Sequence, residues 1–120
     1  MAKVLIVDDS PSQLYNLQRI VEKLGHTVVT AEDGALGVEA AKAEMPDLIL
    51  MDVVMPNLNG FQATRTISRD SETSHIPIIL VTTKDQETDR VWGMRQGAKG
   101  YVTKPVNERE LVKVINENMG

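Results

Sequence analysis

The stretch VLIVDD at residues 4–9 decides the fold of this chain. It is a short apolar run that ends in the carboxylates of Asp8 and Asp9, and a second run, LILM at residues 48–51, ends in Asp52. Continuous apolar runs of this length are typical of parallel strands that are buried on both faces. We therefore expect the carboxyl ends of these strands to point into one acidic site.

The three carboxylates of this site would repel one another. At a separation of about 5 Å and an effective dielectric constant of about 20, each pair costs roughly 3 kcal/mol. A divalent cation offsets such a cost, because hard cations such as Mg²⁺ take oxygen ligands. The acidic cluster of Asp8, Asp9 and Asp52 is therefore the best clue to function.

The composition excludes several classes of protein. The chain has 120 residues, of which 42% are hydrophobic and 25% charged, as expected for one globular domain. Its net charge of −4 argues against nucleic-acid binding, which normally needs a basic stripe. It has no cysteine for disulfides or thiolate metal sites, and no apolar run approaches the roughly 20 residues that span a membrane.

The two ends of the chain add further expectations. The first apolar run begins too close to Met1 to leave room for a signal peptide, so we expect a cytoplasmic protein. The last helical pattern ends next to Gly120. We therefore expect a single domain over residues 1–120 with no output domain, which acts as a monomer.

Strand-like and helix-like segments alternate along the chain. Strands are expected at residues 3–7, 27–31, 48–51, 76–81 and 101–103. Helices are expected from Ser10-Pro11 to Gly25 and at residues 35–44, 61–69, 85–96 and 107–118. This alternation predicts an α/β fold with a doubly wound parallel sheet and helices on both faces.

Polar side chains follow the predicted strands at the sheet edge where ligands bind in such folds. Besides the carboxylates, they are Thr82, Thr83 and Lys104. An aspartate at a strand end is more often a helix N-cap, and a lone lysine is usually solvated. Two adjacent aspartates cannot both act as caps, however, and Asp52 is followed by VVMP rather than by a helix. The whole set predicts a phosphoryl-transfer site with an aspartate nucleophile.

Six segments match one known family in order and spacing. They are VLIVDD (4–9), LMDVVMP (50–56), Gly60, VTT (81–83), Gly97-Ala98 and GYVTKP (100–105). On these residues the whole chain resembles the receiver domains of two-component response regulators. The resemblance implies a flavodoxin-like, doubly wound five-stranded parallel sheet of order 2-1-3-4-5 with five helices.

The resemblance implies a role for each residue of the acidic site. Asp52 would be the phosphoacceptor, which attacks the phosphohistidine of a sensor histidine kinase. Asp8, Asp9 and Asp52 would hold Mg²⁺ or Mn²⁺, and the main-chain carbonyl of Val54 would complete the protein ligands. Such a domain is not an enzyme, beyond promoting its own phosphorylation and dephosphorylation.

Other residues would respond to the phosphoryl group. Thr82 would donate a hydrogen bond to it, and Lys104, joined to Pro105 by a cis peptide bond, would pair with it. Tyr101 would be the aromatic switch residue that turns inward when Thr82 moves. The face of the fourth helix, fifth strand and fifth helix would then bind a downstream protein, with Trp92 as a possible anchor on it.

A finer similarity concerns residues 59–65 and 82–93. They resemble stand-alone receivers of chemosensory pathways that control twitching motility by type IV pili, so the kinase would be of the chemosensory type. The protein could act as a messenger or as a phosphate sink, and both remain open. Val54 and Lys84 differ from the corresponding residues of the best-known chemotaxis receiver, and both flank the path of the hydrolytic water. The resemblance therefore does not predict the lifetime of the aspartyl phosphate.

Three other functions use a comparable sheet. The main alternative is a metal-dependent phosphohydrolase with an aspartyl nucleophile, but such enzymes carry Asp-x-Asp at the first strand, whereas Asp8 and Asp9 are adjacent. A flavin carrier is disfavoured because the acidic loop at residues 8–13 would repel a flavin phosphate. A binding module with a vestigial site disagrees with the complete set of site residues.

Overall fold

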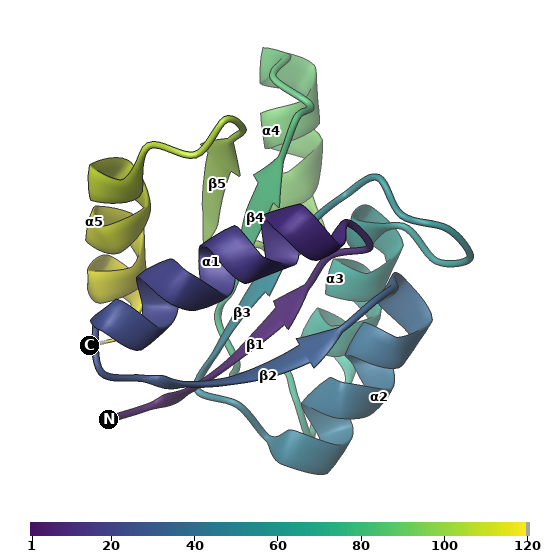
Figure 1. The fold of residues 1–120 in the computed structure, drawn as a ribbon. Helices are drawn as coiled ribbons and strands as arrows, with labels where there is room; N and C mark the ends of the chain where they lie inside the picture. The colour runs from purple at the N-terminus through teal and green to yellow at the C-terminus, as the bar shows by residue number, and fades with distance from the viewer. Residues whose placement is uncertain (120) are drawn as a thin grey trace.

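The computed structural model describes residues 1–119, which form five strands and five helices in strict alternation (Figure 1). The strands are β1 (Lys3–Val7), β2 (Thr27–Ala31), β3 (Leu48–Met51), β4 (Ile78–Thr82) and β5 (Gly100–Thr103). The helices are α1 (Pro11–Lys23), α2 (Gly34–Glu44), α3 (Gly60–Arg69), α4 (Glu87–Arg95) and α5 (Glu108–Asn118).

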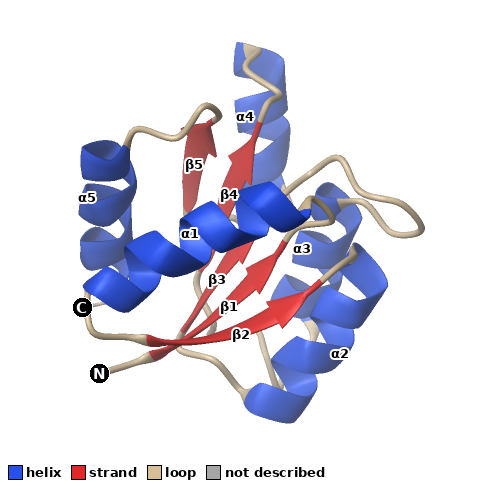
Figure 2. Cartoon of the chain, viewed as in Figure 1, coloured by secondary structure: helices blue, strands red, loops and turns tan. Residues whose placement is uncertain are grey.

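The strands form one parallel sheet in the order β2-β1-β3-β4-β5, which confirms the expected fold. Helices α1 and α5 cover one face, and α2, α3 and α4 lie on the other (Figure 2). Strand β1 has β2 as its neighbour on one side and β3 as its neighbour on the other. The strand order therefore reverses between β1 and β3, where open sheets of this kind bind ligands.

Alternate side chains of each strand enter the two cores on either side of the sheet. In β1, Val4 and Ile6 pack with α1 and α5, whereas Leu5 and Val7 pack with α2 and α3. All residues of β3 and β4 are buried. Two-sided burial explains why these strands are continuously apolar rather than alternating.

The predicted boundaries differ from the observed ones chiefly around β4 and α4. The strand begins at Ile78 rather than Ile76, because Pro77 cannot donate to the sheet and the Ile76 N–H bonds to the Thr73 carbonyl in a turn. Helix α4 begins at Glu87 instead of residue 85. Gln86 is its N-cap residue, and the Gln86 N–H donates to the Asp89 carboxylate at 3.3 Å.

Among residues 1–119, no helix combines the length and the apolar character needed to cross a bilayer.

Candidate functional site

The neighbouring ends of β1 and β3 bring the predicted carboxylates together. Val7 and Met51 are paired across the two strands, so Asp8 and Asp52 leave the sheet side by side. One carboxylate oxygen from each of Asp8, Asp9 and Asp52 lies within 4.8 Å of the other two. Asp8 and Asp52 are only 1% and 8% exposed, while Asp9 faces solvent. The cluster is thus buried on one side and accessible on the other.

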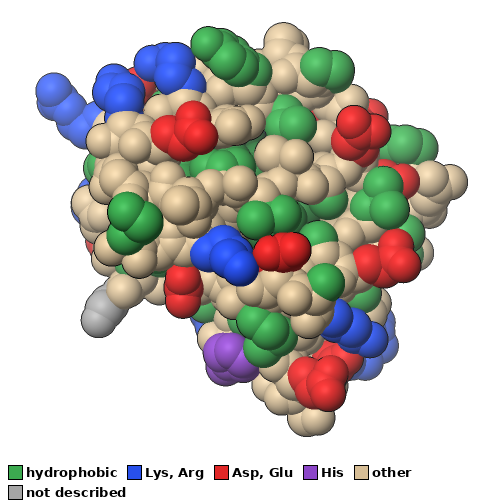
Figure 3. Space-filling view, turned by 60° about the horizontal axis from the view of Figure 1, so that its bottom comes forward, with side chains coloured by type: hydrophobic (Ala, Val, Ile, Leu, Met, Phe, Trp, Pro, Cys, Tyr) green, Lys and Arg blue, Asp and Glu red, His purple; other side chains and the backbone are tan. Residues whose placement is uncertain are grey.

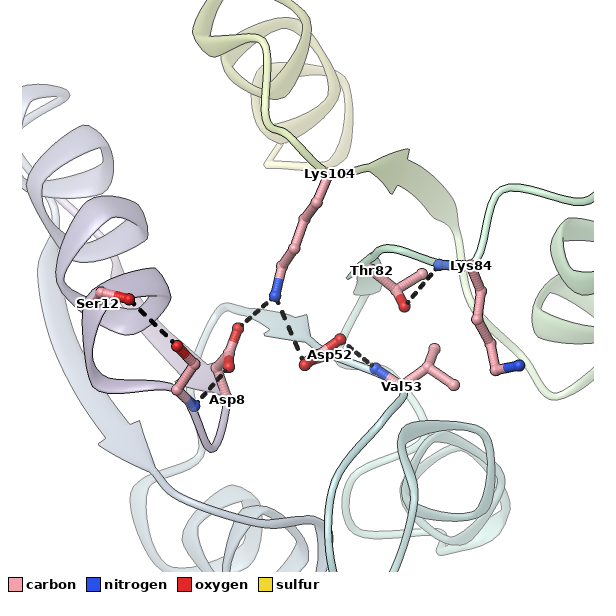
Figure 4. Close-up of polar contacts among 8 residues, drawn as sticks. Asp8, Ser12, Asp52, Val53, Thr82, Lys84 and Lys104 are labelled. Atoms are coloured by element: carbon pink, nitrogen blue, oxygen red, sulfur yellow. Dashed lines mark hydrogen bonds and ion pairs between the residues drawn. The ribbon is translucent and has the colours of Figure 1, made fainter.

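Lys104 reaches this cluster from the loop after β5 (Figure 4). Its Nζ lies 2.8 Å from Asp8 Oδ2 and 3.5 Å from Asp52 Oδ2. Its main-chain N–H donates to the Thr82 carbonyl at 2.8 Å, and the bond between Lys104 and Pro105 is cis, as expected. In this structure the ammonium therefore hydrogen bonds to Asp8 and is only an ion-pair partner of Asp52.

Main-chain N–H groups bind the other oxygens of the two buried carboxylates. The Ser10 N–H donates to Asp8 Oδ1 at 2.9 Å, and the Val53 N–H donates to Asp52 Oδ1 at 2.8 Å (Figure 4). Neither donor could be predicted from the sequence, because almost every residue type has a main-chain N–H. Ser10 is the N-cap residue of α1, but its hydroxyl makes no capping hydrogen bond and is instead paired with the Ser12 hydroxyl at 3.3 Å.

The environment of Asp52 disfavours its charged form. Burial raises the pKa of the Asp52 carboxyl above its ordinary value, Lys104 partly opposes the rise, and the negative charge of Asp8 adds to it. Three carboxylates face one ammonium here, so the cluster keeps an excess of negative charge. Oxygen donors with excess negative charge are what Mg²⁺ and Mn²⁺ prefer.

Thr82 and Tyr101 are linked through the main chain of Lys84. The Thr82 hydroxyl is fully buried and accepts a hydrogen bond from the Lys84 N–H at 3.2 Å. The Tyr101 hydroxyl donates to the Lys84 carbonyl at 2.7 Å. Figure 4 shows the Lys84 side chain directed away from Lys104. One residue therefore contacts both predicted switch side chains through its backbone.

Two predicted residues present exposed apolar side chains. Trp92 is 50% exposed on α4, next to the exposed Val91 and Met94. The Val54 side chain, just after the cluster, is also exposed. The structure thus brings Asp8, Asp9, Asp52 and Lys104 together, and it places Trp92 on a separate helix surface. The roles assigned to these residues remain predictions.

Comparison with known proteins identifies the family. The family model for the response regulator receiver domain matches residues 4–116. This chain is a response regulator receiver domain. The receiver is 62% identical over 116 residues to Protein PilH of Pseudomonas aeruginosa, which covers 97% of this chain and 96% of PilH.

Solved structures of other receivers have the same fold. Chemotaxis protein CheY4 of Vibrio cholerae aligns with a TM-score of 0.91 at 33% identity, over 98% of both chains. The receiver domain of sensor histidine kinase PA1611 from Pseudomonas aeruginosa aligns with a TM-score of 0.91 at 30% identity, over 99% of this chain and 98% of that one. That receiver was crystallised with a magnesium ion coordinated in its active site cleft.

Proposed function

We propose that this receiver accepts a phosphoryl group on Asp52 from the phosphohistidine of a sensor histidine kinase in a Mg²⁺-dependent reaction. The observation that carries the proposal is the cluster itself, in which the Asp52 carboxylate lies 3.5 Å from the Lys104 ammonium and within 4.8 Å of two further carboxylates. A nucleophile, a cation binding site and a fixed positive charge are what phosphoryl transfer requires.

The cation binding site would consist of Asp8, Asp9 and Asp52, with the main-chain carbonyl of Val54 as a further ligand. All these donors are oxygens, which suits Mg²⁺ or Mn²⁺. Bound there, the cation would neutralise charge on the transferred group. The exposed Asp9 supports the assignment, because it leaves the side of the cluster toward solvent open to an ion and a phosphoryl donor.

In the transfer step, a carboxylate oxygen of Asp52 attacks phosphorus and the bond from phosphorus to the imidazole nitrogen breaks. The electron pair of that bond stays on the imidazole. Lys104 would move from Asp8 toward the new phosphoryl oxygens, and the buried Thr82 hydroxyl would donate to them. Tyr101 would follow Thr82, since both bind the main chain of Lys84.

We further propose a stand-alone regulator in the cytoplasm, in a chemosensory pathway that controls twitching motility by type IV pili. The identity with PilH over nearly the full length of both chains supports this assignment. The signal would leave through the face of α4, β5 and α5, where the half-exposed Trp92 would anchor a target protein. The monomer would act as a messenger or as a phosphate sink.

The test is incubation with Mg²⁺ and acetyl phosphate followed by intact mass spectrometry. We expect one adduct of about 80 Da, the mass of a phosphoryl group, that needs Mg²⁺ and is absent from Asp52→Asn. An adduct that persists in Asp52→Asn would show that another residue is the phosphoacceptor. Sustained release of phosphate over many turnovers, without a stable adduct, would instead favour the phosphohydrolase.

A further inference from the structure

The loop between β3 and α3 carries two main-chain groups of the proposed site. These are the Val53 N–H, which donates to Asp52, and the Val54 carbonyl. At the end of the loop, the Gly60 N–H donates to the Val53 carbonyl at 2.9 Å, and a Cβ on Gly60 would lie 1.9 Å from the Asp52 carbonyl oxygen. The two ends of the loop are therefore held against each other, and its middle needs a separate support.

The N-terminus of α2 supplies that support. Asn57, in the left-handed conformation with φ 67°, donates from Nδ2 to Asp33 Oδ2 at 3.2 Å. A Cβ on Gly34 would lie 2.0 Å from the Leu58 carbonyl oxygen, so the backbones of the helix and the loop are in direct contact. A side chain at residue 34 would push the loop away.

The β2–α2 corner, residues 31–34, also contacts the other half of the acidic cluster. The Ala31 carbonyl accepts from the Asp8 N–H at 3.1 Å. The Asp33 carboxylate uses both oxygens, since Oδ1 accepts from the Leu36 N–H at 2.8 Å as the N-cap of α2. One corner thus joins the strand end that carries Asp8 to the loop that follows Asp52.

We propose that Asp33, Gly34 and Asn57 are positioning residues, which hold the β3–α3 loop so that the Val53 N–H and the Val54 carbonyl face the cation and the phosphoryl group. The inference rests on the proposed function and adds a support that lies outside the acidic cluster. Outer partners of this kind typically change metal affinity by about 10- to 100-fold when they are removed.

The first variant is Asn57→Asp, and Mn²⁺ is the probe, with free Mn²⁺ measured by electron paramagnetic resonance. Aspartate keeps the size of asparagine and tolerates the left-handed conformation, but it places a second carboxylate against Asp33. We expect the Kd for Mn²⁺ to rise about tenfold. The added negative charge alone would attract the cation and lower the Kd, so the direction of the change separates the two effects.

The second variant is Gly34→Ala, which places a methyl group against the Leu58 carbonyl. Its matched control is Gly37→Ala in the same helix, whose Cβ would meet the Val7 methyl groups at 3.0 Å. We expect Gly34→Ala to weaken Mn²⁺ binding more than Gly37→Ala does. Should Gly34→Ala fail to fold, Asn57→Gly replaces it, since glycine relieves the positive φ and removes the bond to Asp33.

The outcomes separate this inference from the proposed function. If wild type forms the Asp52 adduct while Asn57→Asp, Gly34→Ala and Asn57→Gly bind Mn²⁺ as wild type does, the positioning role is wrong and the proposed function stands. If wild type forms no adduct but these variants bind Mn²⁺ more weakly, the proposed function fails and the support of the loop is retained.

Discussion

The ammonium of Lys104 is shared unequally between two buried carboxylates, and it lies closer to Asp8 than to Asp52. All three side chains are almost completely removed from water. A buried charge that loses its partner costs several kcal/mol, because neither water nor another group replaces the lost interaction. Lys104 is therefore the cation that offsets the negative charge of the two buried carboxylates.

Replacing Lys104 with methionine should remove this compensation. We expect Lys104→Met to lower the free energy of unfolding by about 3 kcal/mol in metal-free buffer, measured by urea denaturation. The control is Lys3→Met, which removes a solvent-exposed pair with Glu44 at 3.2 Å and should cost less than about 1 kcal/mol. Equal losses in the two variants would contradict the structural role given to Lys104.

The phenol of Tyr101 should lose its proton at a higher pH than an ordinary tyrosine. Burial raises the pKa of Tyr101 to about 12, and the charges of Asp89 and Asp85 act in the same direction. The folded state thus favours the protonated phenol. This contribution to stability is complete below pH 10, the ordinary pKa, and is lost as the pH rises through about 12.

This titration can be followed by near-ultraviolet absorbance of the folded protein. Tyr101→Phe should remove the phase that appears near pH 12 and leave the remaining tyrosine signal intact. A phase that persists in Tyr101→Phe would assign the late titration to another group.

At the scale of elements, α4 rests on the sheet through a residue without a side chain. A Cβ on Gly93 would lie 2.6 Å from Leu80 Cδ1, and 3.3 Å from both Phe61 Cε1 and Tyr101 Cε2. Glycine weakens a helix by about 1 kcal/mol relative to alanine. Glycine nevertheless fits position 93, because the helix approaches β4 and the Tyr101 ring too closely there to leave room for a side chain.

The variant Gly93→Ala tests whether the gain in helix propensity or the loss of close packing has the larger effect on stability. The gain in helix propensity is about 1 kcal/mol, whereas overpacking a buried contact costs about 1–3 kcal/mol. We expect a net loss of stability in thermal unfolding, together with a change in Trp92 fluorescence, because Trp92 is the neighbouring residue on α4. A stabilised Gly93→Ala with unchanged fluorescence would mean that α4 can shift away from the sheet without cost.

Sequence patterns predicted the elements well, but they predicted the contacts between loops poorly. The buried runs at residues 4–7 and 48–51 could be recognised as strands because both faces are covered by helices. By contrast, the bond between Asn57 and Asp33 joins residues that are far apart in sequence and depends on one left-handed turn. The carboxylates could be predicted from their strand ends, whereas the Ser10 and Val53 N–H groups could not, because every residue offers such a donor.

At the scale of the whole molecule, we expect folding and cation binding to be coupled through the acidic cluster. The reversal of strand order forces the ends of β1 and β3 together, and their carboxylates with them. The face seen in Figure 3 mixes Lys and Arg with Asp and Glu side chains. On that face the charges of opposite sign are interspersed, whereas the acidic cluster concentrates charges of one sign.

Magnesium should therefore stabilise the native state by mass action. At a concentration about 100 times the Kd, we expect the free energy of unfolding to rise by about 2.7 kcal/mol. Asp9→Asn should be more stable than wild type without metal, because it relieves repulsion, and it should gain less from Mg²⁺. Melting curves with and without Mg²⁺ test both statements, and an equal gain in the two proteins would exclude Asp9 as a ligand.

The two hydrogen bonds of Lys84 have a consequence for how this protein can evolve. Thr82 and Tyr101 both bind its main chain, through the N–H and the carbonyl respectively. Substitution by any residue except proline, which lacks the N–H, can therefore change the charge, length or shape of the side chain at position 84 and keep the main-chain groups of both bonds. Natural selection can therefore alter the surface beside the acidic cluster through the side chain at position 84. The main-chain link between the Thr82 hydroxyl and Tyr101 would stay the same.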